Sequence, residues 1–261
     1  MNREKDRIIV SKPFWGGGIF LVVCGIGYLM LLCDFFKIIE GDLYDEEIII
    51  KSGECGDRDT LFVGIIGDSY ALRQNYRKQL LEEELIGTLG DTTRIKVQIA
   101  SLGGRQSDSI LHGCNNQFKE IFSSRPDYCV VFAGINDVFI KEKRKSPSYY
   151  AHNMVQIFEK LNELGIIPIA CEIPHIRLDM TRAEHYLISY EKQQEFLQQY
   201  REALKDSISL HNMTLLYLSL DSWSPQVNHE IFEDQVHLND NGFVILDKAI
   251  ANLIATDYRT K

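Results

Sequence analysis

The sequence has little of what metal, redox and nucleic-acid sites are built from. Its six cysteines are spread along the chain and none form a C-x-x-C pair, which argues against a zinc site or a thioredoxin-type centre. No group of acidic residues and histidines has the spacing of metal ligands, so we expect no metal and no other cofactor. No long basic run is present and the net charge is −9, which argues against nucleic acid as the main partner.

One long uncharged stretch lies near the N-terminus. Residues 13–33 contain no charged side chain, and this length can cross a hydrocarbon core of about 30 Å as a helix. Basic residues precede the stretch and acidic residues follow it, so the positive-inside rule places the N-terminus in the cytoplasm. The alternative is a cleaved signal peptide, but the stretch is longer than a usual h-region and no A-x-A-like site follows. We expect a single-pass membrane protein.

The chain is predicted to have four parts. They are a cytoplasmic tail over residues 1–12, a transmembrane signal-anchor over 13–36, a juxtamembrane linker over 37–54 and one domain over 55–261. With 45% hydrophobic and 25% charged residues, the composition is that of a globular protein, and the last part has the length of one domain. The predicted topology places that domain outside the cytoplasm, in a periplasmic, cell-surface or luminal space.

Within the domain, apolar runs that are typical of buried strands alternate with segments of helical spacing. The strand-like runs are residues 61–66, 94–100, 128–133, 166–173 and 213–220. A continuous apolar run such as 128–133 indicates a strand that is buried on both faces. Regular alternation of strands and helices predicts a mainly parallel sheet with helices on both faces, which is a three-layer α/β/α architecture.

The first strand-like run ends in Gly67-Asp68-Ser69, and a segment with helical spacing follows it. In open parallel sheets, ligands bind at the carboxyl ends of the strands. Ser69 therefore lies where reactive groups usually lie, and the backbone N–H groups at a helix start suit a developing negative charge. The alternative is that Ser69 only caps the helix, because Ser and Asp are both favoured at that position.

Three further polar clusters follow predicted strands or precede the last helix. They are Gly103-Gly104, Gly134-x-Asn136-Asp137 and Asp234-x-x-His237. Acyl transfer by serine needs a nucleophile, an imidazole base, a group that orients the base, and donors for the oxyanion. Ser69 can supply the nucleophile, His237 the base and Asp234 the orienting carboxylate. Asn136 offers an amide donor, and a strand-end glycine offers a backbone N–H.

In this order and spacing, the four clusters resemble the sequence blocks of the SGNH (GDSL) hydrolase superfamily, which includes esterases, lipases, thioesterases and carbohydrate acetylesterases. The resemblance runs from about residue 61 to residue 253 and implies a flavodoxin-like fold. It implies a catalytic triad of Ser69, Asp234 and His237. It also implies an oxyanion hole formed by the N–H groups of Ser69 and Gly104 and by the side chain of Asn136.

Several residues near these clusters have weaker assignments. Tyr70 stands where many members of the superfamily have Leu or Ile, which leaves the shape of the acyl pocket open. His175 and Arg177 follow the fourth strand-like run and could touch the substrate, the alternative being a surface or structural role. Asp68 and Asp137 are expected to stabilise turns rather than to take part in catalysis. Gly103 is a near alternative to its neighbour as the oxyanion glycine.

The sequence thus predicts a membrane-anchored, extracytoplasmic serine esterase that cleaves acyl esters, with short-chain and acetyl esters foremost, through an acyl-enzyme. An acetylated glycan suits a domain outside the cytoplasm as the substrate. Three alternatives stay open. They are an O-acetyltransferase for cell-wall or exported polysaccharide, a lipase or thioesterase, and a glycan-binding or scaffold domain that kept the motifs without the activity.

Overall fold

The computed structural model describes residues 60–90, 93–139, 144–175, 190–220, 229–234 and 236–260. All of these residues belong to the unit Glu54–Lys261. The predicted tail, signal-anchor and linker, over residues 1–54, lie outside the described residues, as does the predicted start of the domain at residue 55. Among the helices in the described ranges, none is long and apolar enough to cross a membrane.

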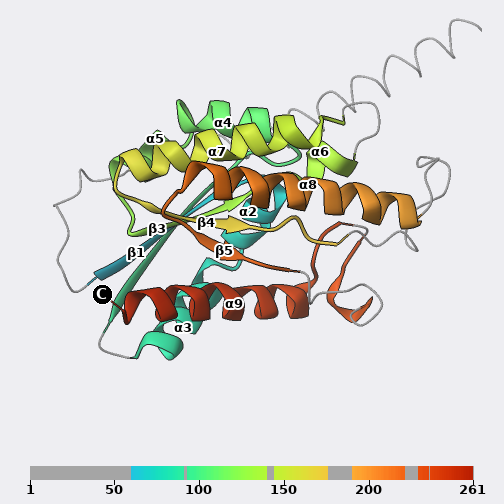
Figure 1. Ribbon diagram of the computed structural model, residues 1–261. Helices are drawn as coiled ribbons and strands as arrows, with labels where there is room; N and C mark the ends of the chain where they lie inside the picture. The colour runs from blue at the N-terminus through green and yellow to red at the C-terminus, as the bar shows by residue number, and fades with distance from the viewer. Residues whose placement is uncertain are drawn as a thin grey trace, which may run out of the picture. The chain divides into compact units, whose positions relative to one another are not determined.

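Five parallel strands form the central sheet in the order β2-β1-β3-β4-β5 (Figure 1). The strands are β1 (Thr60–Gly67), β2 (Arg94–Ser101), β3 (Tyr128–Phe132), β4 (Ile167–Cys171) and β5 (Leu216–Leu218). Each neighbouring pair is parallel, which confirms the predicted parallel sheet. The chain winds one way from β1 to β2 and the other way from β3 onward. The carboxyl ends of β1 and β3 therefore flank the point where sheets of this kind bind ligands.

The strands follow the apolar runs of the sequence. The central strands β1 and β3 are buried along almost their whole length, whereas the edge strand β2 is partly exposed. This difference is expected, because a central strand of a parallel sheet is covered by helices on both faces. The predicted runs over residues 166–173 and 213–220 extend beyond β4 and β5, since only Ile167–Cys171 and Leu216–Leu218 have strand geometry.

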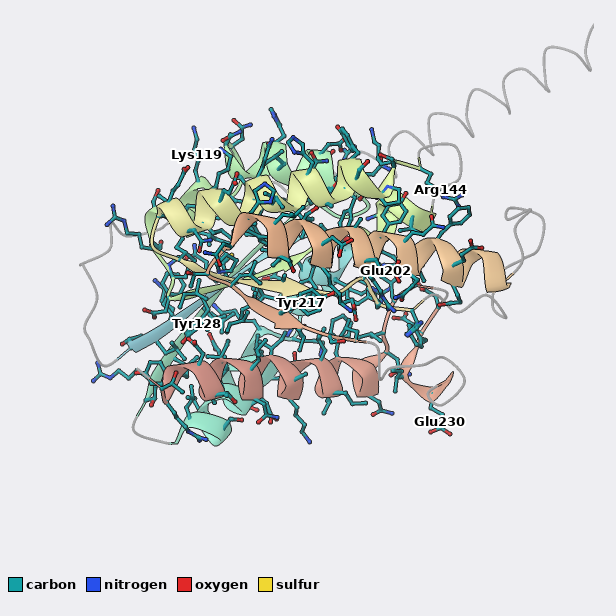
Figure 2. All side chains as sticks on the ribbon, in the orientation of Figure 1. Lys119, Tyr128, Arg144, Glu202, Tyr217 and Glu230 are labelled. Atoms are coloured by element: carbon teal, nitrogen blue, oxygen red, sulfur yellow. The ribbon has the colours of Figure 1, made fainter. Side chains whose placement is uncertain are left out.

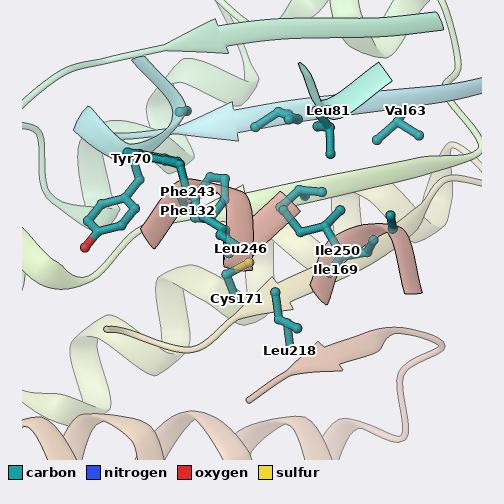
Figure 3. Close-up of a cluster of buried hydrophobic side chains, with 14 of the residues drawn as sticks. Val63, Tyr70, Leu81, Phe132, Ile169, Cys171, Leu218, Phe243, Leu246 and Ile250 are labelled. Atoms are coloured by element: carbon teal, nitrogen blue, oxygen red, sulfur yellow. The ribbon is translucent and has the colours of Figure 1, made fainter. Parts of the chain in front are cut away.

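Helices cover both faces of the sheet (Figure 1). One face packs against α3 (Lys78–Leu89) and α9 (Asp240–Tyr258), and the other packs against α4 (Ser107–Cys114), α5 (Lys119–Ser123), α7 (Pro147–Glu163) and α8 (Tyr190–His211). Side chains fill the space between these layers (Figure 2). Figure 3 shows the first of the two apolar clusters, in which Leu246 and Ile250 of α9 lie over Ile169 and Leu218 of the sheet. The predicted three-layer architecture is confirmed.

The helical segment after β1 consists of two helices. It begins with α2 (Ser69–Asn75), turns at Tyr76 and Arg77, and continues as α3. The turn carries polar contacts to α9: the guanidinium of Arg77 lies 2.6 Å from Asp240 Oδ1 and 3.7 Å from Asp247 Oδ2. These ion pairs hold the end of α2 against α9, and α2 is the helix that begins with Ser69.

Candidate active site

The turn between β1 and α2 presents Ser69 at the first residue of α2. A Cβ atom at Gly67 would lie 2.1 Å from the carbonyl oxygen of Phe132, so only glycine lets β1 approach the end of β3 this closely. Asp68 then donates its backbone N–H to the same carbonyl at 3.0 Å. Its side chain caps α2 by accepting from the N–H of Tyr70 at 3.0 Å. The cap is therefore Asp68, and the alternative assignment of Ser69 as the cap is wrong.

The structure brings Ser69, His237 and Asp234 together, although Ser69 and His237 are 168 positions apart in the chain. Ser69 Oγ lies 2.9 Å from Nε2 of His237, and Nδ1 of His237 lies 2.7 Å from Asp234 Oδ2. A carboxylate only accepts hydrogen bonds, so Nδ1 carries the proton and Nε2 has a lone pair that faces the serine hydroxyl. This arrangement can remove a proton from Ser69.

Asp234 is held in its ionised form. Burial opposes the charge, but hydrogen bonds from the His237 ring and from the backbone N–H groups of Val236 and His237 outweigh it and lower the pKa of Asp234 well below its ordinary value. The two backbone bonds reach Oδ1, at 2.9 Å from Val236 and 2.8 Å from His237. The carboxylate therefore stays charged at neutral pH, where it can orient the imidazole.

The glycine and asparagine predicted for the oxyanion hole lie at the carboxyl ends of the strands that flank β1. Gly104 follows β2, is exposed and has a φ of 68°, which favours glycine. Asn136 lies on the short helix α6 (Ile135–Phe139) after β3. Its Nδ2 donates to the carbonyl oxygen of Arg105 at 2.9 Å and lies 3.5 Å from Asp68 Oδ2. The amide thus bridges the loop after β2 and the turn that carries Ser69.

Two buried carboxyls support this end of the sheet. Burial raises the pKa of Asp68 to about 7, an effect that the N–H of Tyr70 opposes and the nearby Asp137 reinforces. Burial likewise raises the pKa of Asp137 to about 6. Asp137 accepts from the backbone N–H of Ser107 at 2.9 Å and from its hydroxyl at 2.7 Å. The contacts of Asp137 join α4 to α6, whereas Asp68 stabilises the turn between β1 and α2.

Two residues of α2 that the sequence did not single out as positioning groups hold the segment that carries the base. The hydroxyl of Tyr70 donates to the carbonyl oxygen of Val236. The guanidinium of Arg73 contacts the carboxylate of Glu233 and lies 3.6 Å from Asp234 Oδ2. Arg73 follows Ser69 by four residues, so helical spacing alone places both on one face of α2. Tyr70 had no such signal, because its partner is a backbone carbonyl 166 positions further along the chain, which no motif marks.

The two residues predicted to touch the substrate are His175 and Arg177. His175, after β4, has Nδ1 3.0 Å from Gln194 Oε1 on α8, and its contact with substrate stays a prediction. Arg177 lies outside the described residues.

Within the described ranges, no group of three or more His, Cys, Asp or Glu could hold a metal ion. Cys114, Cys129 and Cys171 are buried free thiols.

No protein-family model and no curated protein matches the sequence. Solved structures do match. A GDSL-like lipase from Bacteroides thetaiotaomicron has a TM-score of 0.59 at 13% identity, over 78% of this chain and 92% of that chain. The acetyl xylan esterase AlAXEase has 0.56 at 19%, over 76% and 99%, and an acetylxylan esterase from Geobacillus stearothermophilus has 0.54 at 16%, over 78% and 96%. The chain therefore has the fold of the SGNH (GDSL) hydrolases, as the resemblance implied.

Proposed function

We propose that this chain is a serine ester hydrolase in which Ser69 attacks the ester and carries the acyl group. One observation carries the proposal. Hydrogen-bond distances of 2.9 Å and 2.7 Å join Ser69 to His237 and His237 to Asp234, at the carboxyl end of the parallel sheet. The shared fold with GDSL-like lipases and acetyl xylan esterases supports the same reading.

The proposed reaction uses the three residues in turn. His237 Nε2 takes the proton of Ser69 as Oγ bonds to the ester carbonyl carbon, and Asp234 stabilises the imidazolium that results. When the tetrahedral intermediate collapses, the bond to the alcohol breaks and His237 returns the proton to the departing oxygen. A water molecule, deprotonated by His237, then attacks the acyl carbon. The bond from that carbon to Ser69 Oγ breaks, His237 returns the proton to Oγ, and the acid is released.

Asn136 and Gly104 are the proposed donors to the oxyanion, together with the N–H of Ser69. An amide nitrogen carries two hydrogens. One bond from Asn136 Nδ2, to the Arg105 carbonyl at 2.9 Å, fixes the side chain. The other contact, to Asp68 at 3.5 Å, is long, so the second hydrogen is the one proposed to donate to the negative oxygen of the tetrahedral intermediate. The donor thus strengthens its bond when the charge develops.

Acetyl and other short-chain esters are the proposed substrates, and acetylated glycans are the leading class. Two acetyl xylan esterases are among the structures that share the fold, which favours acetyl groups on a sugar. The same acyl-enzyme serves an O-acetyltransferase if a sugar hydroxyl replaces water as the acceptor. Hydrolysis of acetylated xylan, compared with acetyl transfer from p-nitrophenyl acetate to xylan, separates the two: acetyl transfer faster than hydrolysis would make the chain a transferase.

A membrane anchor and an extracytoplasmic domain are also proposed, on the charge pattern around residues 13–33 alone. Protease added to bacterial spheroplasts that express the full chain, in which only the cytoplasmic membrane is intact, should digest the domain and leave a short N-terminal fragment. Protection of the domain until that membrane is broken would place it in the cytoplasm and contradict the proposed topology.

The test of the activity is hydrolysis of p-nitrophenyl acetate, butyrate and octanoate by the full chain. Ser69→Ala should lose the activity by several orders of magnitude, as expected for removal of a nucleophile. Ser209→Ala is the matched control, because the exposed Ser209 hydroxyl donates only to a carbonyl of its own helix. Turnover that survives in Ser69→Ala would refute the proposal. A preference for octanoate over acetate would instead favour a lipase or thioesterase.

A further inference from the structure

The side chain of Tyr70 lies between the nucleophile helix and the base. It is buried, with 3% of its surface exposed. Its ring packs against Phe132 of β3 and Phe243 of α9, with centroid distances of 5.9 Å and 6.1 Å (Figure 3). The ring centroid of His237 is also 6.1 Å away. The core thus fixes the side chain of Tyr70, and its ring lies next to the imidazole of His237.

The hydroxyl of Tyr70 reaches the one peptide unit that precedes His237. It donates to the carbonyl oxygen of Val236. The N–H of the same peptide unit belongs to His237 and donates to Asp234 Oδ1 at 2.8 Å. Both polar ends of this peptide are therefore bonded, one to the nucleophile helix and one to the triad carboxylate. Because the peptide is planar, holding both ends fixes the plane and with it the Cα of His237, from which the side chain leaves the backbone.

We propose that Tyr70 is a positioning residue whose hydroxyl holds the peptide before His237, and thereby holds Nε2 against Ser69 Oγ. Tyr70 follows Ser69 directly, so the restraint on the base and the nucleophile start from adjacent residues of one helix. Burial keeps the pKa of Tyr70 well above its ordinary value, so the hydroxyl retains its proton and donates. The effect on rate rests on the proposed esterase function, whereas the effect on the geometry of His237 does not.

Arg73 contacts the same segment more weakly. Its side chain is 30% exposed and that of its partner Glu233 is 58% exposed, so water and salt screen their attraction. The bond from Tyr70 is part-buried and lies on the core side of the segment. A phenylalanine at position 70 would fill the same space without a donor, so the restraint depends on the hydroxyl and not on the bulk of the side chain.

Tyr70→Phe tests the inference, because it keeps the ring and removes only the hydroxyl. Tyr128→Phe is the matched control: its hydroxyl donates to Asp257 Oδ2 at 2.7 Å, and the residue begins β3 at the amino end of the sheet (Figure 2). We expect kcat for p-nitrophenyl acetate to fall about tenfold in Tyr70→Phe, the worth of one hydrogen bond. KM should not change, since the hydroxyl bonds to the protein and not to substrate. Tyr128→Phe should stay within about twofold of the unchanged chain.

A second readout follows the base itself. The proton between His237 Nδ1 and Asp234 should give a resonance far downfield in the proton NMR spectrum, assigned by its loss in Asp234→Asn. We expect this resonance in the unchanged chain and in Tyr128→Phe, and its broadening or loss in Tyr70→Phe. Tyr70→Leu also lacks a donor but leaves part of the buried space empty, so a larger fall in kcat than in Tyr70→Phe would separate the packing of the ring from the bond of the hydroxyl.

The outcomes separate the two proposals. If the full chain hydrolyses no ester, the proposed function fails, and the NMR resonance alone then decides the role of Tyr70. If kcat and the resonance are both unchanged in Tyr70→Phe, the positioning role is overturned. An equal fall of kcat in Tyr70→Phe and Tyr128→Phe would also overturn it, because the loss would then reflect general stability.

Discussion

The candidate site has a base side and an oxyanion side, and the two differ in whether their side chains already contact the groups that they are proposed to act on. On the base side, Ser69 Oγ, His237 and Asp234 are within hydrogen-bond distance, at 2.9 Å and 2.7 Å. On the oxyanion side, Asn136 Nδ2 bonds to the carbonyl of Arg105 instead, at 2.9 Å. The base side can therefore generate a nucleophile before substrate arrives. In the proposed reaction, the oxyanion side gains its partner only when negative charge forms, which is where stabilisation lowers the barrier.

The base side and the oxyanion side are also held in place by different kinds of contact. Side chains of α2, led by Tyr70, hold the segment that carries His237. On the other side, side-chain and backbone contacts both join the strand ends: Asn136 donates to the carbonyl of Arg105, and the N–H of Leu102 donates to the carbonyl of Gly67 at 2.7 Å. Substitutions should therefore affect the base side through side-chain contacts, whereas those on the oxyanion side can also act through backbone conformation.

The largest effect is expected from breaking the base side. His237→Ala removes the only group within reach that can take the Ser69 proton among the described residues, and kcat should fall roughly 10⁴- to 10⁶-fold. His152→Ala is the control, since His152 is exposed on α7 and pairs with Gln156. Steady-state hydrolysis of p-nitrophenyl acetate measures both. Loss of less than about tenfold in His237→Ala would show that another group is the base.

Breaking the oxyanion side should cost less. Asn136→Ala removes one donor and should lower kcat by roughly 10²- to 10³-fold, with a smaller change in KM, because the bond matters most in the transition state. Asn116→Ala, which removes an exposed amide that bonds to His112 within its own segment, is the matched control. Equal kinetics for the two variants would mean that Asn136 serves only to tie the loop to Asp68.

Asp68 links the base side and the oxyanion side, and its protonation should make stability depend on pH. Its pKa is raised to about 7 in the folded protein against an ordinary value near 4, so the folded state holds a proton that the unfolded chain has released. Stability is full below the unfolded pKa and falls as pH rises toward the folded one, by on the order of 2 kcal/mol between pH 5 and pH 7.

Urea unfolding at pH 5 and at pH 7 measures this loss. Asp68→Asn has no carboxyl to titrate and should flatten the dependence. Asp137, with a pKa of about 6, and Asp247, also about 6, should leave a smaller slope of the same sign. The lowered pKa of Asp234 affects stability only in acid, outside this range. An identical slope in Asp68→Asn would show that Asp68 titrates normally.

The smallest effect concerns backbone conformation on the oxyanion side. Gly104→Ala meets no atom within 4 Å, but its φ of 68° strains an L-residue, which should lower the free energy of unfolding by about 1 kcal/mol. Gly87→Ala also meets no atom within 4 Å and lies inside α3, so it should raise stability by about 0.5 kcal/mol or more. Thermal unfolding compares the two. The same sign of change in both variants would contradict the conformational explanation.

Much of the fold followed from local pattern. The apolar runs at residues 61–66 and 128–133 were sufficient to predict β1 and β3, because a strand buried on both faces must be apolar throughout. The runs around β4 and β5 were predicted too long. An apolar segment can pack without pairing, and pairing depends on a neighbour that local sequence does not reveal. The turn at Tyr76 that divides α2 from α3 was missed for a similar reason, since its contacts are with α9.

The candidate site, too, was predicted only where local sequence carries the signal. Motif spacing singled out Ser69 and the segment from Asp234 to His237, and the structure brings these residues together. The identity of the cap was ambiguous, because Asp68 and Ser69 are equally suited by residue type and only the contact with the N–H of Tyr70 decides between them. The bond from Tyr70 to the Val236 carbonyl could not be foreseen, because no motif singles out a backbone carbonyl as a partner.

One measurement tests the central claim most directly: reaction of the full chain with a fluorophosphonate, followed by mass spectrometry of its peptides. An activated serine forms a covalent adduct with such a reagent, whereas an ordinary serine does not. The account predicts one adduct, on Ser69, absent in Ser69→Ala and formed far more slowly in His237→Ala. An unmodified Ser69, or an adduct that forms at the same rate without His237, would contradict it.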